Sequence, residues 1–322
     1  MNSTKRLTEA SLLTSLFIVA TIIAVGIGIG YAFYLDFIVP VFFAIICLKC
    51  GLRYSILSSC SSTLIIFLVL GDIGTAIWMS QSIIVGILCG LLIKKPTLVI
   101  DDFFYASIIG VIIMVFIDIY ASKLIGYSFM EEFQGYANMV NNIKFINIVF
   151  YMFIALLPMG TIFCVYVLTL LLGNKINVLN KISKKKLYML KNFKVCGRYL
   201  SCSKRIFFYC SVYILIIELL NILGIRINQT YIRTILISSQ YICFYFVIRD
   251  AIILSQNYII LKYNKTLYLR IFSFITFLSL MLFFRITTFI LIILNLTIDK
   301  KISIRIKQNA IIDNYINKLI YW

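Results

Sequence analysis

The chain contains no histidine among its 322 residues. Histidine is the usual general base, the base partner of nucleophilic serine or cysteine, and the commonest metal ligand. Because the remaining residues show no acid/base constellation either, we do not expect an enzyme. Acidic residues are also scarce, with 12 Asp and Glu against 30 Lys and Arg. Only three prolines occur, which suits long uninterrupted helices.

Nucleotide and cofactor motifs are missing as well. There is no G-x-x-x-x-G-K-[ST] phosphate loop, so the chain cannot drive transport with a nucleotide site of its own. Gly26, Gly28 and Gly30 lie in an apolar run without the strand-to-helix context of a dinucleotide loop. Cys47 and Cys50 form a C-x-x-C pair, but without a second pair or a histidine it does not indicate zinc or redox chemistry. We therefore expect no cofactor and no metal.

Apolar residues, in contrast, are abundant. The sequence is 62% hydrophobic and 13% charged, with a mean hydropathy of +1.02. Soluble domains carry about 25% charged residues. The composition predicts an all-α polytopic membrane protein with eight or nine transmembrane helices. The apolar run after Lys5 and Arg6 is too long for a signal-peptide core and shows no convincing cleavage site, so we expect it to remain as the first membrane helix.

Six apolar runs predict six membrane spans in the N-terminal half. They cover roughly residues 10–35, 37–48, 54–70, 73–93, 103–125 and 145–172. The second run has only 12 residues, about 18 Å of helix, which is short for a bilayer. Only if it crosses do the basic loops all lie on the cytoplasmic side, with Asp36 and Asp72 outside. We therefore expect it to cross, through local thinning of the bilayer or burial among its neighbours.

Ten basic residues and no acidic residue lie in the segment 175–205. This pattern is typical of a cytoplasmic loop beside an anionic leaflet. No nucleic-acid-binding module accompanies the charge, so we expect the partner to be the lipid bilayer and not nucleic acid. The interleaved apolar residues predict a helix lying on the inner leaflet. Its candidate lipid- or partner-binding residues are Lys184, Lys185, Lys186, Lys191 and Lys194.

The last third of the sequence is less regular and leaves alternatives open. The run 232–261 carries adjacent Arg249 and Asp250; either each finds its own partner, or the span ends near Val247 and an interfacial helix follows. The run 267–296 either crosses once or forms a hairpin that turns near Arg285. The predicted organisation is a membrane domain at 1–173, a basic cytoplasmic segment at 174–205, and C-terminal transmembrane helices with a basic tail at 206–322.

Two features of the N-terminal half predict functional surfaces. Ala20, Ala24 and Gly28 recur every four residues and form a stripe against which another helix can pack closely. Packing within this protein is the favoured interpretation, and docking of a second protein is the other. Asp118 lies in an apolar run, and an intramembrane carboxylate is by default a candidate functional residue. Trp78, with Gln81 near it, fits an interfacial residue and a pocket residue equally well.

Several stretches carry a resemblance to a known family. The opening segment TKRLTEA at 4–10, the short second span with Pro40, and KCGLR at 49–53 resemble the YybS-like bacterial membrane proteins. That family has no known function. The stretch from Leu296 to Arg305 resembles the end of the same family, although the usual glycine and aromatic residues are absent here.

The YybS-like family is in turn similar to the substrate-capturing S components of energy-coupling-factor transporters. This resemblance implies a six-helix fold for residues 1–173 and a stripe on the first helix that docks a membrane coupling subunit working with ATPases. Ala20, Ala24 and Gly28 match that stripe, with glycine in place of the last alanine. The ligand pocket carries over by location only, near the outer face. It would contain Asp36, Asp72, Trp78, Gln81 and Asp118, an acidic set that favours a cationic ligand.

The sequence therefore predicts a multi-pass protein of the bacterial cell membrane with a cytoplasmic N-terminus. The leading hypothesis is a substrate-binding or transport-associated component that is energised by partner proteins. The alternative is a non-transporting structural or regulatory membrane protein that acts through its basic loop.

Overall fold

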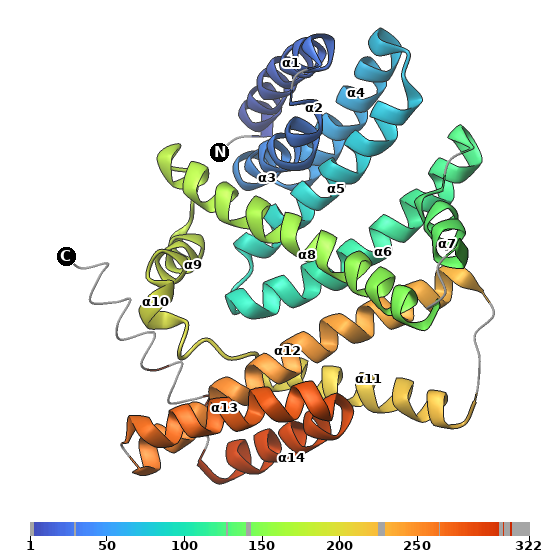
Figure 1. The fold of residues 1–322 in the computed structure, drawn as a ribbon. Helices are drawn as coiled ribbons and strands as arrows, with labels where there is room; N and C mark the ends of the chain where they lie inside the picture. The colour runs from blue at the N-terminus through green and yellow to red at the C-terminus, as the bar shows by residue number, and fades with distance from the viewer. Residues whose placement is uncertain are drawn as a thin grey trace. The chain divides into compact units, whose positions relative to one another are not determined.

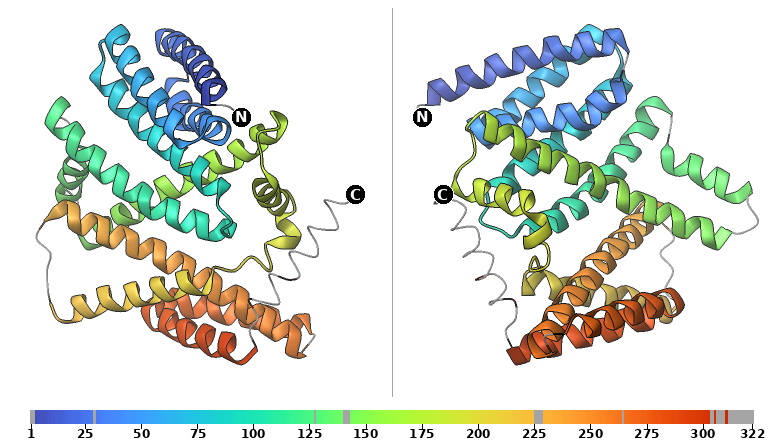
Figure 2. Two further views of the ribbon diagram at one scale, coloured as in Figure 1. Left: turned by 180° about the vertical axis from the view of Figure 1, so that it is seen from behind. Right: turned by 60° about the vertical axis from the view of Figure 1, so that its left-hand side comes forward.

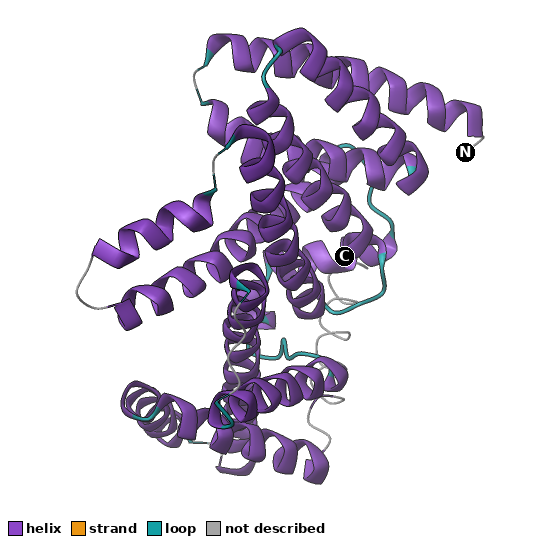
Figure 3. Ribbon diagram, turned by 90° about the vertical axis from the view of Figure 1, so that its right-hand side faces the viewer, coloured by secondary structure: helices purple, strands orange, loops and turns teal. Residues whose placement is uncertain are grey.

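The computed structural model describes residues 3–28, 30–126, 128–139, 143–224, 229–263, 265–302, 305 and 310. All the regular secondary structure of these residues is helical, without a strand (Figure 3). Eight of the described helices are long and apolar enough to cross a membrane. The predicted all-α membrane class is confirmed.

The helices follow one another with short connections (Figure 1). Their bounds are α1 Ser3–Ile27, α2 Tyr31–Phe33, the π-helix η1 Tyr34–Ile38, α3 Val39–Cys50, α4 Leu52–Leu70, α5 Ile73–Lys94, α6 Val99–Ile125, α7 Phe129–Met139, α8 Ile143–Lys175, α9 Lys181–Lys191, α10 Phe193–Cys196, α11 Lys204–Ile222, α12 Thr230–Tyr263, α13 Thr266–Leu282 and α14 Phe284–Ile302. The candidate membrane spans are α1, the continuous stretch Tyr31–Cys50, α4, α5, α6, residues Ile146–Lys175 of α8, α11 and α12.

The chain divides into two compact units. Unit 1 comprises Met1–Thr97 and Tyr105–Leu187, and unit 2 comprises Leu98–Phe104 and Tyr188–Trp322. The residues of each unit contact mainly residues of the same unit, so the two units are described separately. The sequence-based division at 173 and 205 stays a prediction.

The second membrane segment is longer than the sequence predicted. The first helix ends at Ile27, not near Leu35, because Gly28 and Gly30 adopt positive φ angles of 71° and 70°. That backbone conformation is open to glycine at little steric cost, and it breaks the helix. Residues 31–35 therefore join the second span, which reaches 20 residues in Tyr31–Cys50. At 1.5 Å per residue this is about 30 Å, so the segment needs no thinned bilayer to cross.

A π-turn lies where the second span passes Pro40. Residues Tyr34–Ile38 form η1, and Pro40 follows in the first turn of α3. Proline has no backbone N–H and cannot complete the α-helical hydrogen bond to the carbonyl four residues earlier. A single π-turn is a common way to accommodate such a break without ending the helix.

Unit 1 is organised around a very close contact between α3 and α5. A Cβ atom built on Gly86 would lie 2.2 Å from the carbonyl oxygen of Pro40, and one built on Gly90 would lie 2.9 Å from that of Ala44. The small residues spaced by four along α5 therefore form the face that packs on the backbone of α3. Within a bilayer the hydrophobic effect does not drive helices together, so their association depends on van der Waals contacts. Glycine at the crossing lets the two backbones come close enough to form many such contacts.

Aromatic and aliphatic side chains surround this contact. Phe17 of α1 is 1% exposed and meets the ring of Phe43 of α3 edge-on at 5.0 Å between centroids. Leu35, Met79 and Ile83 belong to the same buried cluster. The inward face of α1 consists of Ala10, Thr14, Phe17 and Thr21, which recur at helical spacing.

Two lysines satisfy helix ends in unit 1. Lys94 Nζ donates to the carbonyl of Cys47 at 2.6 Å, at the end of α3. Lys186 Nζ, on α9, donates to the carbonyl of Leu92 at 2.8 Å, and Ser183 Oγ donates to that of Ile93 at 3.1 Å. The last carbonyls of a helix lack partners within the helix and carry partial negative charge. These contacts attach α9 to the end of α5.

In unit 2, α11 and α12 pack against each other in opposite directions. Cys202, just before α11, hydrogen bonds to Asp250, while Tyr213 of α11 donates to the carbonyl of Leu236 at 3.0 Å. α12 is one uninterrupted helix of 34 residues. At about 51 Å it exceeds the thickness of the hydrocarbon layer. The helix does not break near Val247, and where its membrane-crossing part ends stays a prediction.

The last apolar run is a hairpin of two helices. α13 ends at Leu282, and α14 begins at Phe284 and lies beside α13 (Figures 1 and 2). The hydroxyl of Thr287 donates to the carbonyl of Ser279 at 2.9 Å across the turn. Of the two alternatives that the sequence left open, the hairpin near Arg285 is confirmed.

The α3–α5 contact leads to a stability prediction. We expect Gly86→Ala to lower the free energy of unfolding by about 1–3 kcal/mol, because its methyl group meets backbone atoms that cannot rotate away. The measurement is the thermal unfolding midpoint of the purified protein in one detergent.

Gly160→Ala is the matched control, because Gly160 is exposed on α8 and nothing lies within 4 Å of a Cβ there. It removes a helical glycine and should stabilise by up to about 1 kcal/mol. Equal midpoints for the two variants would contradict the close α3–α5 contact.

Candidate functional site

A polar cluster in unit 1 joins three of the five predicted pocket residues. The indole Nε1 of Trp78 donates to Asp36 Oδ1 at 2.8 Å. The ring of Trp78 also meets that of Tyr31 edge-on, with centroids 5.9 Å apart. The hydroxyl of Tyr31 donates to Thr75 Oγ1 at 2.6 Å, and the hydroxyl of Thr75 donates to Asp72. We call Asp36, Trp78, Tyr31, Thr75 and Asp72 the aromatic–acidic cluster.

Asp72 in this cluster is the N-cap of α5. Its carboxylate accepts from the backbone N–H of Gly74 at 2.9 Å and of Thr75 at 3.1 Å. The hydrogen bond from the Thr75 hydroxyl, aided by these two, lowers the pKa of Asp72 below its ordinary value. Asp72 is therefore anionic at neutral pH. Its contribution to stability is present above the unfolded-state pKa and is lost as the pH falls through the lowered folded-state pKa.

The cluster is accessible as well as hydrogen bonded. Trp78 is 37% exposed, Asp72 is exposed, and Asp36 is half-buried. An ionised carboxylate has about four acceptor positions. Asp36 uses one of them for Trp78, so it retains capacity for a further donor.

The other two predicted pocket residues lie outside this hydrogen-bonded cluster. Gln81 is half-buried on α5 and forms no hydrogen bond with a described residue. Asp118 is 8% exposed and accepts from Ser128 Oγ and from the backbone N–H of Phe129, both at 2.8 Å. Asp118 thus satisfies the start of α7, where free N–H groups favour a carboxylate.

The stripe on α1 is not the face by which α1 packs in unit 1. Ala20 is exposed, Ala24 is half-buried, and Gly28 is exposed just beyond the end of the helix. Nothing lies within 4 Å of a Cβ built on Gly28. The favoured expectation of packing within this chain is therefore wrong for Ala20 and Gly28, because other residues of α1 fill the core.

One of the five lysines predicted to form an exposed basic surface on residues 184–194 is buried. Lys186 is 3% exposed because it reaches the carbonyl of Leu92, so it does not contribute to an exposed basic face. Lys184, Lys191 and Lys194 are exposed, and Lys185 is half-buried.

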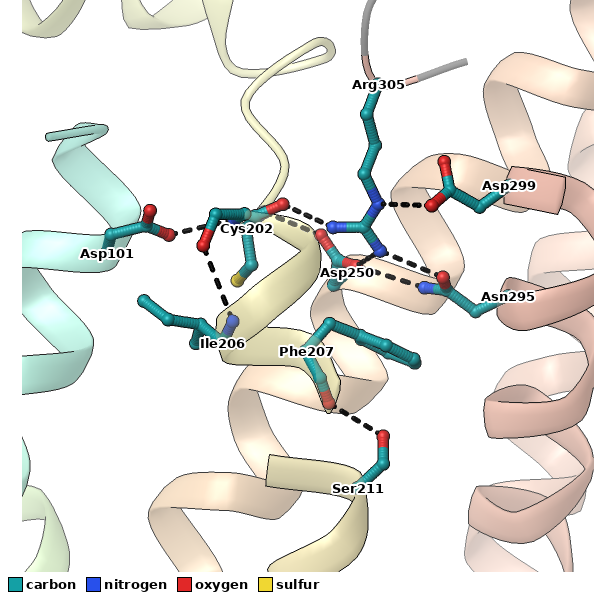
Figure 4. A network of polar contacts seen from close by, with 10 residues as sticks. Asp101, Cys202, Ile206, Phe207, Ser211, Asp250, Asn295, Asp299 and Arg305 are labelled. Atoms are coloured by element: carbon teal, nitrogen blue, oxygen red, sulfur yellow. Dashed lines mark hydrogen bonds and ion pairs between the residues drawn. The ribbon is translucent and has the colours of Figure 1, made fainter. Parts of the chain in front are cut away.

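Unit 2 contains a buried ionic network that the sequence did not reveal (Figure 4). Asp250 of α12 is fully buried and accepts from the backbone N–H of Cys202 at 2.6 Å, Asn295 Nδ2 at 3.0 Å and Arg305 Nη2 at 2.6 Å. Arg305 Nε also lies 3.4 Å from Asp299 Oδ2. We call these five residues the Arg305 network.

Further contacts of Arg305 complete this network. Its Nη1 donates to the carbonyl of Cys202, and its Nη2 donates to Asn295 Oδ1 at 2.9 Å. The guanidinium carbon lies 5.2 Å from the centre of the Phe207 ring, in cation–π contact. The fork of arginine can bond several acceptors at once, which lysine cannot reproduce.

The network also holds the segment that precedes α11. The backbone N–H of Ser203 donates to Asp101 Oδ1 at 2.9 Å, beside the bond from Cys202 to Asp250. Ser203 Oγ in turn accepts from the backbone N–H of Ile206 and caps α11. Burial raises the pKa of the Cys202 thiol well above its ordinary value, and the nearby Asp250 carboxylate adds to this.

The hydrogen bonds of the Arg305 network join separate segments of unit 2. The network connects α12, α14, Cys202 and Arg305 through buried hydrogen bonds and ion pairs. The one signal in the sequence was Asp250, a carboxylate in an apolar run that requires a partner. Nothing local indicated Arg305, which lies 55 positions further on.

A second ionic contact lies at Glu218 in unit 2. This 7% exposed carboxylate accepts from Gln240 Nε2 at 3.1 Å and lies 3.5 Å from Arg285 Nη1. Glu218 of α11 therefore links Gln240 of α12 to Arg285 at the turn of the α13–α14 hairpin.

The eight apolar helices define the class of the protein as a polytopic integral membrane protein. No protein family, curated protein or solved structure matches the chain in comparisons of sequence and fold.

The Arg305 network predicts a strong asymmetry between single and double variants. Arg305→Met leaves Asp250 as a buried carboxylate without its cation and should cost about 3–5 kcal/mol of unfolding free energy. The double variant Asp250→Asn/Arg305→Met removes both charges and should recover most of this loss. Thermal unfolding of the four proteins in the cycle measures the coupling.

Alkylation of Cys202 gives an independent measurement of the same network. In the parent protein the buried thiol should react slowly with a maleimide, and in Arg305→Met it should react faster as the contact to its carbonyl is lost. Additive stability losses, together with unchanged alkylation, would contradict the network.

Proposed function

We propose that the protein is a membrane component that captures a small cationic solute at the aromatic–acidic cluster of unit 1. The observation that carries this proposal is the hydrogen bond between Asp36 and Trp78, which lie 42 positions apart, and the link from Trp78 to Asp72 through Tyr31 and Thr75. The carboxylate of Asp36 beside the accessible indole, with Asp72 linked to the same cluster, offers a cation both ionic and cation–π attraction. Gln81, one turn from Trp78 on α5, and Asp118 remain predicted members of this pocket.

The proposed orientation places this cluster outside the cell. The positive-inside pattern assigns the basic segment 175–205 and the N-terminus to the cytoplasm. The ends of the second and fourth spans that carry Asp36 and Asp72 then face outward. A solute captured there requires a partner to drive it across, because the sequence has no nucleotide-binding loop.

The proposed partner is a membrane coupling subunit with its ATPases, as the resemblance to S components implies. The exposure of Ala20 supports this role for α1, since a small residue on a lipid-facing helix permits close approach of another helix. The runner-up is a regulatory protein acting through α9, supported by the exposed Lys184 and Lys191.

Tryptophan fluorescence tests the cationic pocket. The sequence has two tryptophans, so a Trp322→Phe background leaves Trp78 as the reporter. We expect tetramethylammonium and spermidine, used as probes at constant ionic strength, to change this emission saturably. Asp36→Asn keeps an oxygen for the Trp78 N–H but removes the charge, and it should weaken the response about two- to fivefold.

Glycerol and glutamate serve as uncharged and anionic controls and should not saturate the signal. No saturable response to either cation, or the same affinity in Asp36→Asn, would contradict the cationic pocket.

Co-purification tests the proposed docking surface separately. The protein is purified gently from its native membranes, and mass spectrometry identifies what accompanies it. We expect a coupling subunit with the parent and its loss from Ala20→Leu/Ala24→Leu, because two bulky side chains prevent close helix packing.

Ala32→Leu on α2 is the matched control, since Ala32 is exposed and lies outside the stripe. Unchanged recovery in the stripe variant would exclude docking through α1. A preparation that never contains a coupling subunit would favour the regulatory function.

A further inference from the structure

A groove in unit 2 lies between α12, α13 and α14. Its volume is about 270 Å³. The lining comes from Ser255, Tyr258 and Ile259 of α12, Phe272 of α13, and Leu294, Thr297 and Ile298 of α14. Most of this surface is apolar, which suits a hydrocarbon chain.

One polar group in the groove is unsatisfied. Ser255 is 3% exposed, and its Oγ has no hydrogen-bond partner among the described residues. Many buried hydroxyls, such as those of Thr14, Ser211 and Thr234, donate to their own helices, whereas Ser255 shares the lack of a partner within the described part of the chain with Thr169 and Ser238. A buried hydroxyl without a partner is unfavourable, so a ligand that accepts its hydrogen bond would stabilise this site.

The surroundings of the groove are basic. No acidic residue lies between Asp250 and Asp299, whereas Lys262, Lys265 and Arg270 flank the turn from α12 to α13. All three are exposed. Lys262 Nζ lies 5.9 Å from the centre of the Tyr258 ring, which itself lines the groove. A negatively charged headgroup at this turn would complement the cations.

The helix α13 presents an apolar surface beside the groove. It has apolar side chains on nearly all sides and they are exposed, as Phe274 at 67% and Met281 at 75% illustrate. Such a helix is stable when hydrocarbon surrounds it. A ligand that enters between α13 and its neighbours therefore comes from the bilayer.

We propose that this groove binds an anionic glycerophospholipid. An acyl chain occupies the apolar groove, an ester carbonyl accepts from Ser255 Oγ, and the phosphate headgroup lies at Lys262, Lys265 and Arg270. This site is independent of the solute pocket proposed for unit 1.

Photo-cross-linking in vesicles tests this site on the full chain. The protein is reconstituted in phosphatidylcholine vesicles with a minor fraction of phosphatidylglycerol carrying a diazirine in one acyl chain. Mass spectrometry maps the cross-linked residues. We expect them to concentrate at 255–259, 272 and 294–298, with competition by unlabelled phosphatidylglycerol but not by phosphatidylcholine.

Two variants separate the contributions of chain and headgroup. Ser255→Ala removes one hydrogen bond and should reduce affinity about two- to tenfold, with the cross-links staying in the groove. Lys262→Gln/Lys265→Gln/Arg270→Gln should weaken binding about fivefold per charge and abolish the preference over phosphatidylcholine.

The matched control removes three exposed lysines of α9, in Lys181→Gln/Lys184→Gln/Lys191→Gln, and should leave labelling of the groove unchanged. Competition by oleate would assign the site to free fatty acids, and competition by glycerol phosphate would assign it to a headgroup alone. Either result, or cross-links spread evenly over Phe274 and Met281, would overturn the proposal.

Discussion

Buried polar groups that must satisfy one another without water determine much of this structure. Asp250 is the strongest example, because a fully buried carboxylate on an apolar helix is tolerated only with donors close by. Three donors from separate segments converge on it, and two of them, Cys202 N–H and Arg305 Nη2, lie at 2.6 Å. The packing of unit 2 thus depends on bringing these segments together.

The same requirement recurs at helix ends in unit 1, with simpler solutions. Lys94 and Lys186 satisfy terminal carbonyls, and Asp72 and Asp118 satisfy terminal N–H groups. Each charge has the sign that complements the helix dipole at its end. Residues that look functional in an apolar sequence can therefore serve the backbone, as Lys186 and Asp118 do.

The sequence predicted the helical class and the positions of most spans, because length and hydropathy are local properties. It misplaced the boundary at residues 28–35, where positive φ angles at Gly28 and Gly30 outweigh a continuous apolar run. It left the last run undecided, since the turn at Phe283 has neither glycine nor proline to mark it.

Site residues were harder to predict, because their partners are distant in the sequence. The family resemblance grouped Asp36 and Trp78 by their location near the outer face, and they share a hydrogen bond. Tyr31 and Thr75, which link Trp78 to Asp72, had no signal of their own. Arg305 appeared in a basic tail and at the end of a family-like stretch, and neither indicated that it is buried at 7% exposure.

The distribution of charge connects the two proposals physically. The residues that orient a chain in the membrane are also those that set the electric potential at each of its faces. In the proposed orientation the outer ends of the second and fourth spans carry Asp36 and Asp72. If α11 and α12 each cross once after the cytoplasmic segment 175–205, the α12–α13 turn returns to the inner side, and its charged residues are Lys262, Lys265 and Arg270. An outer cation and an inner anionic lipid are each attracted to the face where they occur. One asymmetry of the sequence, required for insertion, thereby favours opposite ligands at the two faces.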